Sequence, residues 1–210
     1  MFNFCSKPKA LSKGFTLIEL LAVVVIIGIL AAILIPVSGM IRHKANQSIC
    51  ASNMRQLGTA SKLYTNEHGG KLISTPYIQS GYWFQQLYHY LDVKQRASGT
   101  SKVFTCPEDE EAIKELASGN SEWARLSYLL LKENQEWSRI NEIDDPARSP
   151  AFIDADQPAT NDYKSEARFI SKVKGADGWR HGAGVNVCYW DGSVRYIENP
   201  TYAEVFYLNE

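Results

Sequence analysis

The sequence predicts an α+β chain, in which one long N-terminal helix has a membrane-spanning first half and an amphipathic second half that packs on a small antiparallel β-sheet domain. Three observations predict this fold class: an apolar run over residues 15–37, a helical pattern that continues to about Glu67, and two β-rich runs flanking Asp191-Gly192. The composition, 45% hydrophobic and 21% charged, is typical of a packed core. A formal net charge of -1 provides no basic field, so nucleic acid is not an expected partner.

The apolar run, FTLIELLAVVVIIGILAAILIPV over residues 15–37, contains one ionisable side chain, Glu19. As an α-helix it would be roughly 33 Å long, close to the hydrocarbon thickness of about 30 Å. The apolar core of a cleaved secretory signal is shorter, about 7–15 residues. We therefore expect this run to span a membrane. The flanking charges slightly favour a cytoplasmic N-terminus, with Lys7, Lys9 and Lys13 before the run and Arg42 and Lys44 after it.

The helical pattern continues beyond the apolar run. Apolar and small residues recur at steps of four and three residues from Cys50 to Tyr64, and polar residues occupy the other positions, which is typical of an amphipathic helix. Gly69-Gly70 is a natural terminator. The sequence therefore predicts one helix from about Phe15 to about Glu67, half in lipid and half on a globular domain.

The sequence after the long helix predicts one α+β domain with a single core. Tyr82–Leu91 has apolar residues four apart and predicts a short helix. Pro107–Ala117 begins with proline and acidic residues, as helices do, and its acidic run predicts a solvated face. Asp191-Gly192 is a strong hairpin-turn signal. The candidate strands are Leu126–Leu131, Ala151–Asp154, Arg168–Val173, Val185–Trp190 and Ser193–Ile197.

The segment Lys13-Gly14-Phe15-Thr16-Leu17-Ile18-Glu19 resembles the prepilin processing motif of type IV pilins and of the pseudopilins of type II secretion systems. The resemblance implies cleavage after Gly14 and N-methylation of Phe15. It divides the chain into a leader (1–14), a transmembrane and assembly helix (15–37), and an extracytoplasmic pilin-like globular domain (38–210). A carboxylate in apolar surroundings needs a partner, so Glu19 is expected to bind the α-amine of Phe15 in a neighbouring subunit.

A second motif lies near the C-terminus. His181 is followed by nine residues and then by Asp191-Gly192, which resembles a subgroup of pseudopilin-like bacterial proteins with a His-x9-Asp-Gly motif. Asp191 and Gly192 are interpreted first as turn-forming residues, with a ligand or catalytic role as the alternative. His181 is a candidate capping or packing residue that ties the hairpin to Asp154 or to the long helix. The resemblance implies no chemistry for it.

The cysteines lack the CxxC spacing of a zinc site. In an oxidising compartment one pair would form a disulfide, and Cys50–Cys106 would clamp the long helix to the loop before Pro107. That pairing is one alternative among the cysteines. Cys188, in an apolar strand, is expected to be a small buried hydrophobic residue.

No cofactor is expected. Calcium is the alternative, because some pseudopilin domains bind it near their C-terminal loops, but no EF-hand-like loop is present and solvated loops are the preferred interpretation. Scattered tryptophans invite a carbohydrate-binding interpretation, although such residues are more often core residues. No nucleophile elbow, phosphate loop or metalloprotease motif occurs, so an enzyme is not expected. The candidate calcium ligands are Asp154, Asp156, Asp162 and Asp177.

These observations predict a structural subunit of a type IV pilus-like or type II secretion pseudopilus fibre. The expected partners are a prepilin peptidase and methylase, copies of itself or related pilins, inner-membrane lipid and the assembly machinery. The chain is expected to span the bacterial inner membrane once, with its C-terminal domain in the periplasm or outside the cell. The alternative is a membrane-anchored surface module that binds a polysaccharide or protein and uses the helix for export and anchoring.

Overall fold

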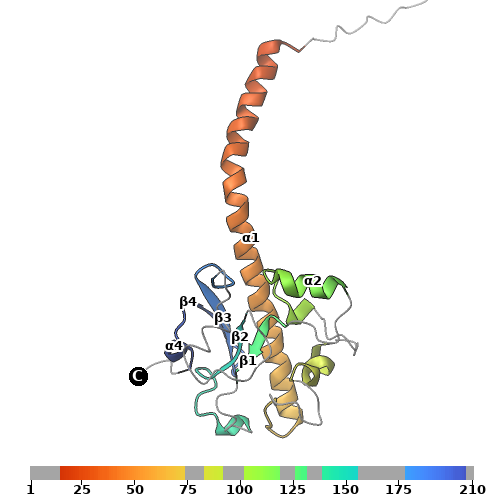
Figure 1. Ribbon diagram of the computed structural model, residues 1–210, viewed down its shortest axis with the longest axis vertical. Coiled ribbons are helices and arrows are strands. Elements are labelled where there is room, and N and C mark those ends of the chain that lie inside the picture. The colour runs from red at the N-terminus through yellow and green to blue at the C-terminus, as the bar shows by residue number, and fades with distance from the viewer. Residues whose placement is uncertain are drawn as a thin grey trace, which may run out of the picture. The chain divides into compact units, whose positions relative to one another are not determined.

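The computed structural model describes residues 15–73, 83–91, 102–118, 126–131, 139–155 and 178–206. The chain divides into two units at the boundary between Ile41 and Arg42. The long helix α1 (Leu17–Glu67) forms the described part of the first unit and begins the second (Figure 1). The predicted long helix is thus confirmed, with its start two residues later than expected and with Pro36 inside it.

Two glycines end α1, as the sequence predicts. Gly69 and Gly70 have φ angles of 63° and 87°, a conformation that residues with a Cβ rarely adopt. The amide of Gly70 donates to the carbonyl of Thr65 at 2.8 Å, the hydrogen bond that closes a Schellman motif. The chain therefore leaves the helix sharply, and Lys71 then pairs with Arg139 in an isolated bridge.

The second unit contains a four-stranded antiparallel sheet in the order β1-β2-β3-β4. Its strands follow one another along the chain, so it is a meander, with β1 at one edge and β4 at the other (Figure 1). Leu129 pairs with Ile153, Ile153 with Val187, and Val187 with Arg195. The predicted α+β fold class is confirmed. The strands are β1 (Tyr128–Leu130), β2 (Pro150–Asp154), β3 (Gly184–Tyr189) and β4 (Val194–Glu198).

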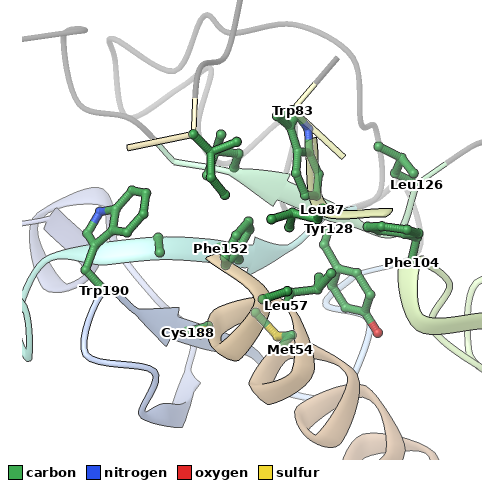
Figure 2. Packing of buried hydrophobic residues seen from close by; sticks show 14 of the residues in the cluster. Met54, Leu57, Trp83, Leu87, Phe104, Leu126, Tyr128, Phe152, Cys188 and Trp190 are labelled. Carbon is green, nitrogen blue, oxygen red and sulfur yellow. The ribbon is translucent and has the colours of Figure 1, made fainter. Parts of the chain in front are cut away.

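Both faces of the sheet are covered, which the alternation of side chains along each strand explains. On one face Phe152 and Cys188 belong to the main core with Met54 and Leu57 of α1 (Figure 2). The next residue along β2, Ile153, points to the opposite face. There it joins a smaller cluster that also contains Leu129, Val185, Val187, Tyr189 and Val205.

The shorter elements differ from prediction at their boundaries. The helix expected from Pro107 begins at Glu110, because Asp109 caps it: its Oδ1 accepts the amide of Ala112 at 3.0 Å. The helix expected over Tyr82–Leu91 is a 3-10 helix, and the candidate strand Arg168–Val173 lies outside the described residues. The shorter elements are η1 (Gln85–Leu91), η2 (Lys102–Phe104), α2 (Glu110–Ser118), η3 (Ile140–Glu142) and α4 (Tyr202–Phe206).

Candidate functional site

Glu19 lies in the first turn of α1 and is hydrogen-bonded within its own chain. Its Oε2 accepts the backbone amide and the hydroxyl of Thr16, each at 2.8 Å, and its own amide donates to the Thr16 hydroxyl at 3.3 Å. This reciprocal arrangement is a capping box. A carboxylate at this position is also favoured by the helix dipole. Glu19 therefore starts the helix, a role that the Thr-x-x-Glu spacing indicates and that the sequence analysis missed.

The surface that follows Glu19 is apolar on every side. All 16 Phe, Leu, Ile and Val side chains between Phe15 and Val37 are exposed within the first unit. In the described part of the chain, α1 is the one helix long and apolar enough to cross a membrane. Such a surface is stable against lipid or against other apolar helices. Phe15 is the first described residue, and Gly14 lies outside the described residues.

Cys50 and Cys106 are joined by a disulfide, and both side chains are fully buried. The bond links α1 to the turn that precedes α2, so it is the clamp named as one alternative from the sequence. Closing a loop across 56 residues of sequence is worth about 4 kcal/mol in the chain-entropy description. Cys188 is a free, buried thiol, and burial raises its pKa to about 12. It is therefore a packing residue.

His181 is buried between two carboxylates. Its Nδ1 lies 3.1 Å from Oε2 of Glu108, and its Nε2 lies 3.2 Å from Oδ2 of Asp154. The same Nε2 is 3.5 Å from the sulfur of Cys106. Each ring nitrogen of His181 therefore faces one carboxylate oxygen. The structure thus brings His181 to Asp154, one of the two partners expected for it, and to the disulfide.

A second ion pair lies beside His181. Arg180 NH2 contacts Oδ2 of Asp109 at 2.9 Å, and the two side chains are 5% and 2% exposed. Arg180 NH1 also donates to the carbonyl of Ser127 at 2.7 Å, and NH2 donates to the carbonyl of Ala155. The hydroxyl of Ser127 donates to Asp109 at 2.8 Å. This network ties the start of α2 to the residue before β1, to the residue after β2 and to the segment before β3.

The acidic run before α2 was expected to form a solvated face, and this is wrong for its first two members. The side chains of Glu108 and Asp109 are 8% and 2% exposed, because His181 and Arg180 lie against them. Glu110 and Glu111 are exposed, as expected. The sequence does mark Asp109, because an aspartate just before a helix is a typical N-cap residue. Nothing local in the sequence marks Glu108 or Arg180, since their partners lie more than 70 residues away.

Asp154 ends the strand β2, as the candidate strand Ala151–Asp154 predicts. Its side chain is fully buried, so the solvated-loop interpretation given to it as a candidate calcium ligand is wrong. The amide of Asn186 donates to its Oδ2 at 2.9 Å, which fastens β2 to β3. The other candidate calcium ligands, Asp156, Asp162 and Asp177, lie outside the described residues. The structure therefore gives the calcium alternative no set of converging oxygen ligands within the described part of the chain.

Comparisons with known proteins give one family model, at the N-terminus, and one relative with a partial match. Residues 9–35 match the family model described as a prokaryotic N-terminal methylation motif. The chain is 48% identical over 56 residues to the type IV major pilin protein PilA of Myxococcus xanthus (strain DK1622). The chain is therefore similar to a type IV pilin over part of its length. The aligned part covers 27% of this chain and about a quarter, 26%, of that pilin's length. No solved structure matches the chain.

Asp191 and Gly192 form the turn between β3 and β4. Oδ1 of Asp191 accepts the amide of Ser193 at 2.8 Å, and Gly192 has a φ of 81°. The amide of Gly192 donates to the carbonyl of Tyr189 at 2.8 Å. Lys62 of α1 donates to the carbonyl of Asp191. These contacts favour the turn-forming interpretation and leave the subgroup assignment a prediction.

Gly58 is a packing residue that the sequence analysis missed. A Cβ built on it would lie 2.9 Å from the sulfur of Cys188 and 3.3 Å from the Cα of Gly192. A side chain here would therefore push α1 away from the hairpin. The absent Cβ is what permits the helix and the turn to approach each other.

We expect Gly58→Ala to lower the free energy of unfolding by about 1–3 kcal/mol, the usual cost of overpacking. The sign of this change in the free energy of unfolding is informative. Alanine is the better helix former by about 1 kcal/mol, so without the overpacking the variant would be more stable. Urea titration of the full chain in detergent, followed by tryptophan fluorescence, measures the change. Gly39→Ala is the control, since nothing lies within 4 Å of a Cβ there. A Gly58→Ala variant as stable as the control would contradict this packing argument.

Proposed function

We propose that this chain is a structural subunit of a type IV pilus-like fibre. In this proposal it is processed after Gly14, held in the inner membrane by residues 15–37, and assembled through its N-terminal helix with residues 38–210 displayed outside. The observation that carries the proposal is a helix whose first 21 residues are apolar except for one carboxylate in the first turn, and whose large apolar side chains there are all exposed. The role is structural and not enzymatic. A pilus is preferred to a secretion pseudopilus because the relative is named as a major pilin.

The exposed apolar surface supports assembly by lateral packing of helices. In lipid, these side chains gain little by leaving hydrocarbon for a neighbouring helix, so packing alone gives weak selectivity between partners and registers. A buried charge pair supplies this selectivity, because two helices packed in the wrong register would leave both charges unpaired. Glu19 is the sole ionisable side chain between Phe15 and Val37. It is therefore the group that can set the register.

Cleavage after Gly14 would supply the matching cation. The new terminus at Phe15 carries an α-amine, and N-methylation leaves that amine able to hold a positive charge. The capping box with Thr16 uses Oε2 of Glu19. Glu19 can therefore remain the start of its own helix and still accept a neighbour's amine through Oε1. The proposed partners follow from this: a prepilin peptidase and methylase, other copies of the chain or related pilins, and the assembly machinery.

Processing is tested by mass spectrometry of the chain purified from membranes. We expect the first peptide to begin at Phe15, with a mass increase of one methyl group on its amine. Gly14→Asp, which blocks access to the cleavage site, should leave the leader in place and keep the chain out of sheared fibres. The control is Gly39→Ala, which changes neither the cleavage site nor the charge of the membrane segment. Gly28→Asp is unsuitable as a control because it adds a charge to that segment. A wild-type chain that retains residues 1–14 would contradict the proposal.

One specific observation favours the alternative, a membrane-anchored binding module. A pocket of about 290 Å³ lies beside the β3–β4 turn and is lined by Lys62, Asn66, Trp190 and Asp191 among others. The described tryptophans are poor candidates for stacking on sugars, because Trp83 and Trp190 are buried and Trp179 is packed against the smaller core cluster. Trp123 and Trp137 lie outside the described residues. Monomeric chains with a saturable ligand at this pocket would favour the alternative over the fibre.

A further inference from the structure

Four potential metal ligands converge in the second unit. They are the sulfurs of Cys50 and Cys106, the ring of His181 and the carboxylate of Asp154, and their ligand atoms all lie within 4.8 Å of one another. All four residues are buried. They come from α1, from the turn before α2, from the segment before β3 and from the end of β2. Two thiolates, one imidazole and one carboxylate make a donor set that zinc accepts.

Two of the distances between the donors fit a tetrahedral zinc site. With ordinary zinc–ligand distances, a tetrahedron places sulfur about 3.6 Å from nitrogen and nitrogen about 3.3 Å from oxygen. In the structure the sulfur of Cys106 lies 3.5 Å from Nε2 of His181, and that nitrogen lies 3.2 Å from Oδ2 of Asp154. The two sulfurs are the exception, since they are bonded to each other. As zinc thiolates they would stand about 3.8 Å apart.

The surroundings of the cluster also favour a bound cation. Oδ1 of Asp154 is buried and has no hydrogen-bond partner among the described residues. A buried carboxylate oxygen without a partner is costly, and a metal ion held by both oxygens of Asp154 would satisfy it. Glu108 contacts Nδ1 of His181, the ring nitrogen turned away from Asp154. A carboxylate on the outer nitrogen is the usual support of a zinc-binding histidine.

We propose that the reduced protein binds one Zn²⁺ through Cys50, Cys106, His181 and Asp154. The disulfide and the zinc site are then alternative states of the same four residues. A dithiol donor transfers two electrons and two protons to the disulfide, gives two cysteine thiols and becomes a disulfide itself. Zn²⁺ then displaces both thiol protons and the proton on Nε2. In either state the cluster ties α1 to the sheet, by a covalent bond or by a metal.

The test uses the full chain in detergent, stripped of metal and treated with a phosphine. The phosphine supplies the two electrons and leaves as its oxide, with water giving the oxygen and the two thiol protons. Zn²⁺ is titrated against a chromophoric chelator. We expect one tightly bound Zn²⁺ per reduced chain and none per oxidised chain. Co²⁺ in place of Zn²⁺ should show intense visible bands of a tetrahedral site and near-ultraviolet bands of thiolate ligation.

Variants separate the site from adventitious binding. Asp154→Asn should weaken Zn²⁺ binding at least tenfold, and Cys106→Ser should weaken it further and remove part of the thiolate absorption. Cys188→Ser is the matched control, because Cys188 is buried and free outside the cluster; it should leave the affinity and the Co²⁺ spectrum unchanged. The wild-type spectrum keeps the test valid if a variant fails to fold. A reduced wild-type chain without stoichiometric Zn²⁺, or with octahedral Co²⁺, would overturn the proposal.

Discussion

Replacing Glu19 by glutamine is expected to keep the chain in the membrane and to remove it from fibres. Glutamine at this position preserves a capping box, because its amide oxygen still accepts the hydrogen bonds that Thr16 donates. It cannot neutralise a neighbour's α-amine. Leaving one charge of a buried pair without its partner costs about 3–5 kcal/mol, which corresponds to a loss of at least about 100-fold in the assembled fraction.

Thr16→Val is the matched control for Glu19→Gln. It removes the hydroxyl that caps α1 and keeps the carboxylate. Loss of a cap costs about 0.5–2 kcal/mol of helix stability, and the surrounding membrane holds the helix together, so we expect assembly close to wild type. The measurement is the amount of chain in sheared fibres relative to membranes. If Thr16→Val fails to assemble while Glu19→Gln assembles normally, Glu19 is a helix cap and the charge-pairing mechanism is wrong.

Replacing Arg180 by methionine is expected to lower the free energy of unfolding by about 3–5 kcal/mol. The change leaves the carboxylate of Asp109 buried without its cation. It also removes the hydrogen bonds that Arg180 donates to the carbonyls of Ser127 and Ala155. For a domain whose whole stability is about 5–15 kcal/mol, this loss is a large fraction. Urea titration of the full chain in detergent, followed by tryptophan fluorescence, measures it.

Arg148→Met is the control for Arg180→Met. Arg148 lies 3.5 Å from Asp145, but the two side chains are 56% and 52% exposed. An exposed pair of this kind contributes about 0–1 kcal/mol. The double variant Asp109→Asn with Arg180→Met removes both buried charges, and we expect it to be less destabilised than the sum of the two single changes. Equal effects of Arg148→Met and Arg180→Met would show that the buried pair has no special role.

The features that could be predicted from the sequence are those with a local signal. An uninterrupted apolar run predicts the first half of α1, steps of three and four residues predict the second half, and Gly69-Gly70 predicts its end. The Asp191-Gly192 pair predicts the turn between β3 and β4. In each case the residues that carry the signal are neighbours in the chain, and the physical cause acts over one or two turns of backbone.

The buried polar network has no such signal. Glu108 and Asp109 stand in an acidic run that looks solvated on composition alone, and they become buried because His181 and Arg180 fold onto them. Nothing in the helical pattern distinguishes Gly58 from other small residues, and its role comes from the hairpin that packs against it. These contacts join positions far apart in sequence, so they arise only when α1, β2 and β3 come together.

The most direct measurement of the central claim is zero-length crosslinking in assembled fibres. A carbodiimide joins a carboxylate to an amine in contact with it, and fibres grown from a mixed pool of light and heavy-nitrogen chains distinguish neighbours from single chains. The assembly mechanism predicts a bond from Glu19 to the α-amine of Phe15, with hybrid masses that carry one light and one heavy peptide. Fibres in which Glu19 yields no hybrid product with Phe15, although other contacts between chains do crosslink, would contradict it.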